Sequence, residues 1–299
     1  MLFSSTDDRD LEREVIMTWT ETSIDNWRHL KQYLGDLYSY DPITNWVFRG
    51  QEDFQWDLST SLQRVHTDIN RRVAEEYLLH QFKAAGHHNI ELSGMPQNTL
   101  EWLALMQHHG APTRLLDFTK SPFVACFFAL ERCFQKPAAV WAINTEWLER
   151  QSLRFIRKSI GGYDKLRDFE LQDPSFVALK FDDIFISHSV PLVLPVEPTR
   201  LNERLVVQQG IFLCPGAIET TFEENLLAYK DNTEAGSTYV RKLILGSSLR
   251  AEGLYELHAM NINRASLFRG LDGFAQSLAH KLEIKHDRRQ IERIMKMLA

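Results

Sequence analysis

The sequence is poor in cysteine and has no long apolar run, and both absences narrow the class of protein. Its three cysteines, Cys126, Cys133 and Cys214, form no Cys-x-x-Cys pair. Such a set argues against a disulfide framework and a four-thiolate zinc site. No stretch approaches the roughly 18 apolar residues that cross a bilayer. The first residues lack the basic and apolar regions of a signal peptide. We therefore expect a cytoplasmic protein without a membrane segment.

The chain also lacks an excess of positive charge, with 34 lysines and arginines against 40 aspartates and glutamates. The net charge of −6 leaves no broad basic face for non-specific nucleic-acid binding, although a local basic cleft is compatible with it. The 299 residues are 44% hydrophobic and 25% charged, which is typical of a globular chain with a sizeable core.

Helical and strand patterns intermix without a regular βαβ rhythm. This predicts an α+β fold with a mixed, mostly antiparallel sheet flanked by helices. Residues 147–182 form an insertion-like stretch of mixed charge for which the pattern favours no element. Helices are expected from Ser23, over 70–86 with Gly86 as the stop, over 98–109, from Ser121 through Leu130, over 250–260 and over 274–281. Strands or extended segments are expected at 46–50, 138–143, 185–186, 190–197, 205–213 and 239–245.

An arginine stands where the first buried strand is expected to end. Arg49 offers a planar fork that matches phosphate or carboxylate, and Gly50 lets a ligand approach the backbone. The alternative is that Arg49 pairs with a buried carboxylate and joins two segments. Gln51 belongs to the same candidate site.

Residues 107–119 place histidine, arginine, aspartate and threonine side chains between two apolar helices. His108 and His109 are adjacent and would point about 100° apart on a helix, so we expect no shared metal. Asp117 can pair with Arg49 or Arg114, or orient a histidine.

A third polar cluster leads into residues 207–212. Strand alternation would put Gln208 and Gly210 on one face and Gln209 on the other. One of the two glutamines then faces a cleft and needs a partner. By contrast, the pairs Glu75-Glu76 and Glu223-Glu224 are interpreted as solvated helix surface. The chain has no Gly-rich phosphate loop, GxSxG elbow or papain-like cysteine motif.

These clusters, in this order, resemble the FRG domain family, which occurs widely in bacteria and phages and is named after the triplet Phe48-Arg49-Gly50. The matching segments are residues 46–51, 56–58, 62, 105–119, 121–122, 125–129, 204–205, 208–212, 267–268 and 270–273. One departure is Arg269, where the family usually has proline. The resemblance implies an FRG domain over residues 22–282, with a polar leader at 1–21 and a charged C-terminal helix at 283–299.

The motif order also resembles that of ADP-ribosyltransferases, and that likeness implies roles. Arg49 would grip the pyrophosphate of NAD, which is then a substrate, and Gln208 or Gln209 would occupy the place of the catalytic glutamate. Glutamine cannot supply a negative charge, so either an acid elsewhere, such as Asp117 or Glu203, would take that role, or the domain would bind a nucleotide without transferring it. The candidate catalytic residues are Asp117, Gln208 and His109. The candidate ligand contacts are Arg49, Gln51, Thr113, Arg114, Thr119 and Gln209.

Three hypotheses follow. The first is an NAD-consuming transferase or glycohydrolase that acts as a toxin or phage-defence effector. The second is a binding module for a nucleotide-like molecule, a nucleic acid or a protein. The third is a purely structural network of Arg49, Asp117 and Gln208, whose loss lowers the melting temperature without affecting any ligand. None of them requires a metal or a membrane.

Overall fold

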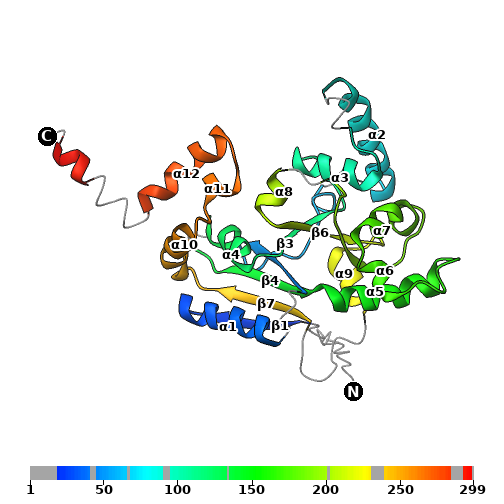
Figure 1. Ribbon diagram of the computed structural model, residues 1–299, viewed down its shortest axis with the longest axis horizontal. Coiled ribbons are helices and arrows are strands. Elements are labelled where there is room, and N and C mark those ends of the chain that lie inside the picture. The colour runs from blue at the N-terminus through cyan, green and yellow to red at the C-terminus, as the bar shows by residue number, and fades with distance from the viewer. Residues whose placement is uncertain are drawn as a thin grey trace, which may run out of the picture.

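One sheet runs through the molecule, with helices on both of its faces (Figure 1). The computed structural model describes residues 19–40, 45–65, 68–89, 95–132, 135–200, 203–229, 239–283 and 292–297. Within these residues the sheet has seven strands in the order β1-β7-β4-β2-β3-β6-β5. The strands are β1 (Thr20–Ile24), β2 (Trp46–Gln51), β3 (Leu116–Thr119), β4 (Ala138–Asn144), β5 (Val193–Val196), β6 (Gly210–Pro215) and β7 (Val240–Leu245). The β1–β7 pair is parallel and the others are antiparallel, which confirms the predicted mixed sheet and α+β class.

The helices begin where the sequence provides caps. The Asn98 side chain accepts a hydrogen bond from the Glu101 amide and starts α3, and Ser121 with Pro122 starts α4, as predicted. The longer helices are α1 (Trp27–Tyr40), α2 (Arg71–Asn89), α3 (Thr99–His108), α4 (Pro122–Leu130), α5 (Thr145–Ser159), α10 (Leu249–Ala259) and α12 (Leu271–Glu283). The shorter ones are α6 (Asp168–Leu171), α7 (Pro174–Leu179), the π-helical turn η2 (Asp182–Ile186), α8 (Glu203–Val207), α9 (Phe222–Leu227) and α11 (Arg264–Leu267).

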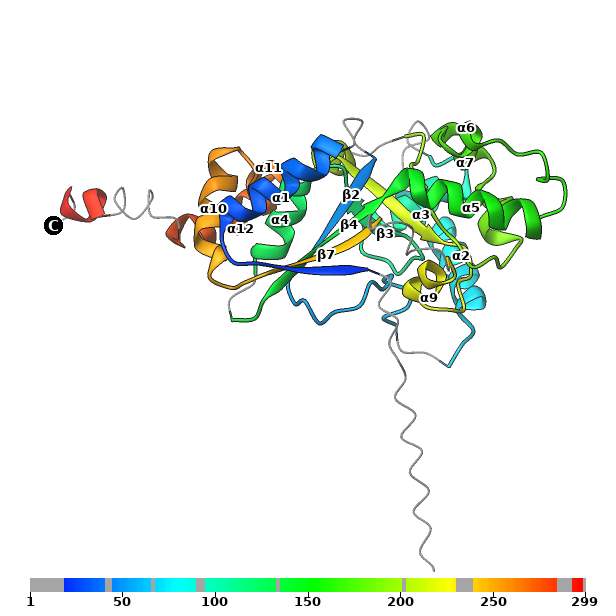
Figure 2. The same ribbon diagram turned by 90° about the horizontal axis from the view of Figure 1, so that it is seen from below.

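Each face of the sheet has its own apolar core. Phe48 of β2 packs with residues of α1, α4 and α10 on one face, whereas Val47 and Trp141 pack with α3 and α5 on the other. Figure 2 shows these two groups of helices gathered on either side of the strands. Because both faces are covered, β4 is buried at every position. Cys126 lies fully buried in the first of these cores.

The glycine that ends the predicted first strand serves packing. A Cβ atom at Gly50 would lie 2.0 Å from the Ala125 carbonyl oxygen and 2.6 Å from the Ala129 nitrogen. Helix α4 therefore approaches the backbone of β2 at this point. Helix α4 thus fills the side of Gly50 where a side chain would stand, and the prediction that Gly50 lets a ligand approach the backbone stays a prediction.

Two predicted helix boundaries were wrong. Ser23 belongs to β1 and does not cap α1; the amide of His29 instead donates to the side chain of Asn26 at 2.9 Å. Helix α2 continues through Gly86 and ends only at Asn89.

Two predicted strands were also wrong. Residues 205–213 divide into the short helix α8 and strand β6, so Gln208 and Gln209 lie in the turn between them. Residues 185–186 belong to η2, and the insertion-like stretch 147–182 is mostly α5, α6 and α7.

Residues 1–18 of the predicted leader, Cys133 and much of the predicted C-terminal helix lie outside the described residues. Leader residues 20 and 21 belong to β1, and residues 292–297 of the C-terminal segment are helical. The domain boundaries stay predictions. Among the described helices, none is both long and apolar enough to cross a membrane.

Candidate functional site

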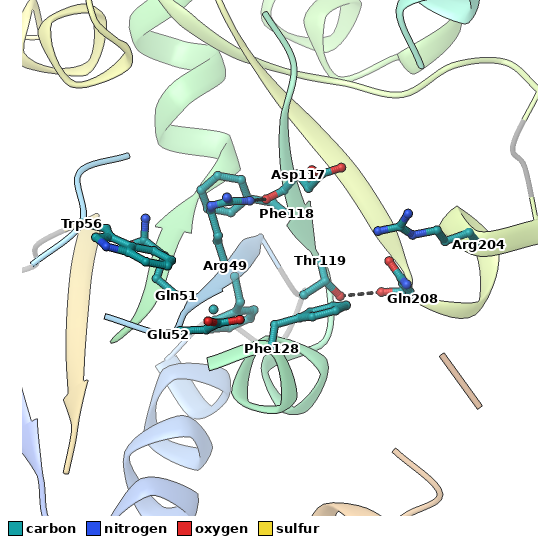
Figure 3. Close-up of a pocket in the computed structure, with 12 residues that line it drawn as sticks. Arg49, Gln51, Glu52, Trp56, Asp117, Phe118, Thr119, Phe128, Arg204 and Gln208 are labelled. Carbon is teal, nitrogen blue, oxygen red and sulfur yellow. Dashed lines mark hydrogen bonds between the residues drawn. The ribbon is translucent and has the colours of Figure 1, made fainter. Parts of the chain in front are cut away.

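A pocket of about 270 Å³ lies where β2 and β3 meet the turn between α8 and β6 (Figure 3). It combines two cations, two carboxylates and several aromatic rings. Its lining residues are Phe48, Arg49, Gly50, Gln51, Glu52, Trp56, Asp117, Phe118, Thr119, Phe128, Arg204 and Gln208.

Arg49 lies in the middle of this pocket, between Trp56 and Asp117 (Figure 3). One terminal nitrogen of its half-buried guanidinium, Nη1, donates to the backbone carbonyl of Asp117 at 2.8 Å. Its Nε is shielded from solvent and has no hydrogen-bond partner among the described residues. Burial lowers the pKa of Arg49, and the charge of Asp117 opposes that effect. An arginine stays protonated at neutral pH even so, and donors remain for an anion.

Asp117 exposes its carboxylate at the edge of the pocket. The Gln107 side-chain amide donates to Oδ2 at 2.8 Å and orients the group. Within the described chain Asp117 forms no ion pair, so the predicted pairings of its carboxylate with Arg49 or Arg114 are not formed. The Asp117 carboxylate is placed to accept a proton, or a hydrogen bond from a ligand hydroxyl.

Gln51 positions the loop that carries Trp56. The side-chain oxygen of Gln51 accepts a hydrogen bond from Trp141 Nε1 at 2.7 Å. Its side-chain nitrogen donates to the Asp57 backbone oxygen at 3.1 Å. Both ends of this buried amide are thus occupied by protein groups. Trp56 itself is 53% exposed and presents a ring to the pocket.

Glu52 supplies a second carboxylate, which the sequence reasoning missed. Burial raises the pKa of Glu52, Arg132 at 3.9 Å partly offsets this, and nearby Glu131 adds to it. Its place directly after Gln51, the last residue of β2, was the one available signal, since functional residues are common in the loops that follow rigid elements.

The turn between α8 and β6 closes the pocket. The Thr119 hydroxyl donates to the Gln208 backbone oxygen at 2.7 Å, and the Gln208 amide donates to the Leu267 oxygen at 3.1 Å. Gln209 adopts a φ of 48° and is exposed outside the pocket. Gln208 is therefore the glutamine that faces the site, although it does so from a turn.

Arg204 enters the same space from α8 (Figure 3). Its guanidinium carbon lies 4.9 Å from the centre of the Phe268 ring. Among the described residues no carboxylate pairs with it, whereas the neighbouring Arg264 and Arg269 pair with Glu131 and Glu203.

Besides Gln209, three predicted site residues lie away from the pocket. Arg114 is 1% exposed and forms a buried ion pair with Glu75, so Glu75 is not the solvated surface residue that the sequence suggested. Thr113 is fully buried, and its hydroxyl donates to Gln107 Oε1 at 2.6 Å. His109 is exposed at the C-terminal end of α3. The structure thus brings Thr113 and Arg114 into the core rather than to a ligand.

Glu223 was likewise interpreted as surface. It accepts a hydrogen bond from the Leu58 amide at 2.9 Å, and burial raises its pKa. This hydrogen bond therefore holds the C-terminal end of the loop that carries Trp56. Within the described residues there is no cluster of three or more histidine, cysteine, aspartate or glutamate side chains that could hold a metal ion.

Comparison with known proteins gives one match. Residues 44–137 match the family model described as FRG domain, a range that contains β2, β3 and α4. No curated protein and no solved structure matches the chain. Arg49, Glu52, Trp56 and Asp117 lie inside the matched range, whereas Arg204 lies outside it.

Proposed function

Since residues 44–137 of this chain are an FRG domain, we propose that the pocket formed around its Phe-Arg-Gly triplet binds a nucleotide. The observation that carries this proposal is the placement of Arg49 and Trp56 on one cavity. A guanidinium with unused donors recognises phosphate, and an exposed indole stacks on a base.

Charge and size agree with that ligand class. Arg204 adds a second cation without a carboxylate partner in the described chain, although the protein as a whole is acidic. A cavity of about 270 Å³ lies near the lower end of ligand pockets, which span roughly 300–1,000 Å³, so it suits a mononucleotide-sized group.

The two carboxylates favour cleavage of NAD as a second candidate function. In that reaction the bond between ribose C1′ and the nicotinamide nitrogen breaks, and the nitrogen keeps the electron pair. A water oxygen bonds to C1′, and the carboxylate of Asp117 accepts the proton that the water loses. We assign the base to Asp117 because Gln107 orients its carboxylate, whereas the amide of Gln208 cannot carry the charge.

The test measures binding and turnover on the same protein. AMP and NAD are titrated by calorimetry, and nicotinamide release from NAD is followed over time. Arg49→Ala is expected to weaken AMP binding at least about tenfold. Asp117→Asn should abolish nicotinamide release and retain most of the binding. Lys120→Ala removes an exposed cation outside this pocket, paired with Glu197, and serves as the control.

Three outcomes separate the hypotheses. Binding without nicotinamide release leaves a nucleotide-binding module and removes the enzyme. Wild-type protein that binds neither AMP nor NAD overturns the proposed function and leaves protein or nucleic-acid ligands. If Arg49→Ala lowers the melting temperature but leaves AMP affinity unchanged, the arginine is structural.

A further inference from the structure

A second cavity, of about 400 Å³, adjoins the pocket on the far side of Arg204. It lies between α8 and the segment that contains α11 and α12, and Phe268 and Gln276 are among its lining residues. A small space of about 40 Å³ shares Asp117, Arg204 and Gln208 with the first pocket, and His108 and Arg204 with the second cavity. All three spaces therefore adjoin Arg204.

The Arg204 guanidinium is held at the junction. It lies over the Phe268 ring at 4.9 Å, and Arg264 lies 4.5 Å from the same ring centre. Arg204 and Arg264 differ in whether carboxylates already use their N–H donors. Both carboxylate oxygens of Glu131 accept from Arg264, at 2.7 and 2.8 Å, whereas the donors of Arg204 are not used by any described carboxylate. Arg204 is therefore the available anion-binding group between the cavities.

The volumes of the two cavities indicate how long a ligand the site can hold. The Arg49 pocket alone fits about one nucleotide, and the second cavity offers more space than the first. A ligand that extends from the Arg49 pocket into the second cavity would meet one guanidinium at Arg49 and another at Arg204. We propose that the site takes a ligand of dinucleotide length, in which a pyrophosphate passes Arg204 and the second ribosyl or nucleoside half lies against Phe268. This inference rests on the proposed nucleotide-binding function, not on the second candidate of NAD cleavage, and names the ligand class.

The experiment compares ligands that share one half. AMP, ADP and ADP-ribose are titrated by calorimetry against the wild-type protein. ADP carries the second phosphate without the second ribose, so it controls for charge. We expect ADP-ribose to bind at least about tenfold more tightly than either AMP or ADP.

Filling the second cavity gives the matched test. Gln276→Trp places a large ring in that cavity from an exposed position of α12, and Ala275→Trp adds the same ring one residue away, outside the cavity lining. Gln276→Trp should remove the advantage of ADP-ribose and leave AMP affinity within about twofold. Ala275→Trp should leave both affinities unchanged. Asp272→Trp, which also borders the cavity, replaces Gln276→Trp if that variant does not fold.

The inference is overturned if ADP-ribose binds no more tightly than ADP, or if Gln276→Trp weakens AMP and ADP-ribose equally. In either case AMP binding that depends on Arg49 leaves the proposed function standing. If folded wild-type protein binds none of the three ligands, the proposed function fails and this inference fails with it.

Discussion

The backbone of Gly50 lies so close to Ala125 that a Cβ atom on the glycine would be 2.0 Å from the alanine carbonyl oxygen. The Ala125 carbonyl oxygen is a backbone atom of α4, so it cannot rotate away from an added methyl group as a flexible side chain could. We expect Gly50→Ala to force α4 away from β2 and lower the free energy of unfolding by about 3 kcal/mol, at the upper end of ordinary overpacking costs. Urea unfolding of the variant measures this.

Gly35 provides the matched control for that substitution. It lies on the exposed side of α1, and a Cβ atom there meets nothing within 4 Å. Gly35→Ala should raise the free energy of unfolding by up to about 1 kcal/mol, since alanine is the better helix former. Equal effects of the two variants would show that the glycine of the triplet is not required for packing.

Glu75 and Arg114 form a buried ion pair that holds α2 to the segment before β3. Arg114 Nε donates to Glu75 at 2.8 and 2.9 Å, and Nη1 donates to the Phe185 carbonyl at 2.6 Å. Glu75→Gln leaves a buried guanidinium without its countercharge and should cost about 3–5 kcal/mol of unfolding free energy. The double variant Glu75→Leu with Arg114→Met should cost less than the sum of the single variants.

An exposed pair tests whether burial is the cause. Lys31 and Glu256 lie 3.3 Å apart with both side chains more than a third exposed. Glu256→Gln should change the free energy of unfolding by less than about 1 kcal/mol. A loss as large as that of Glu75→Gln would remove burial as the explanation.

Trp56 gives the proposed nucleotide site its own optical signal. Its ring is 53% exposed at the pocket, so stacking of a base should change its fluorescence. Trp56→Ala is expected to weaken AMP binding by about 1–3 kcal/mol, and Trp56→Phe by less. Phe169→Ala removes an exposed ring on α6, outside the pocket, and should leave AMP affinity unchanged. An unchanged affinity in Trp56→Ala would exclude stacking on this residue.

The sequence predicted those elements whose signals are local. Asn98 and Ser121 cap their helices through amides three residues away, and the strand at 46–50 is marked by its own composition. Long-range pairing decided the failures. Ser23 lies in β1 because that strand pairs with β7, more than 200 residues further along the chain. Residues 205–207 form one helical turn, which is too short for periodicity to distinguish from a strand.

The same contrast between local signals and long-range contacts explains which residues of the candidate site could be predicted. Arg49 could be predicted to lie near Asp117 because both belong to short polar segments between apolar elements, and the Arg49 side chain does donate to the Asp117 backbone carbonyl. Arg114 could not be assigned, because its partner Glu75 lies on a helix whose periodicity gives no sign that a carboxylate faces inward. Trp56 and Arg204 reach the pocket from a loop and from the short helix α8, and the direction of the loop depends on tertiary contacts such as those of Gln51.

Glu149 should make stability depend on pH. It borders a separate cavity of about 210 Å³ that also contains Lys120 and Glu197. Burial, with a smaller contribution from the charge of Glu146, raises the pKa of Glu149 from 4.5 to about 7. Between these two values the folded state binds more protons than the unfolded state. The free energy of unfolding therefore falls as the pH rises from about 4.5 to about 7, and by up to about 3 kcal/mol for this group.

Glu149→Gln isolates that contribution, because the amide occupies the same volume and does not titrate. Urea unfolding at pH 5 and pH 7.5 should show a smaller loss of stability between the two conditions in Glu149→Gln than in the wild type. At pH 7.5 the variant should be the more stable of the two proteins, since it avoids a carboxylate that is charged while partly buried beside Glu146. Glu76→Gln removes one carboxylate from the exposed surface of α2 and controls for the change in net charge. If Glu149→Gln and the wild type lose stability in parallel across this range, another group titrates, and the cavity beside Lys120 does not shift the pKa of Glu149.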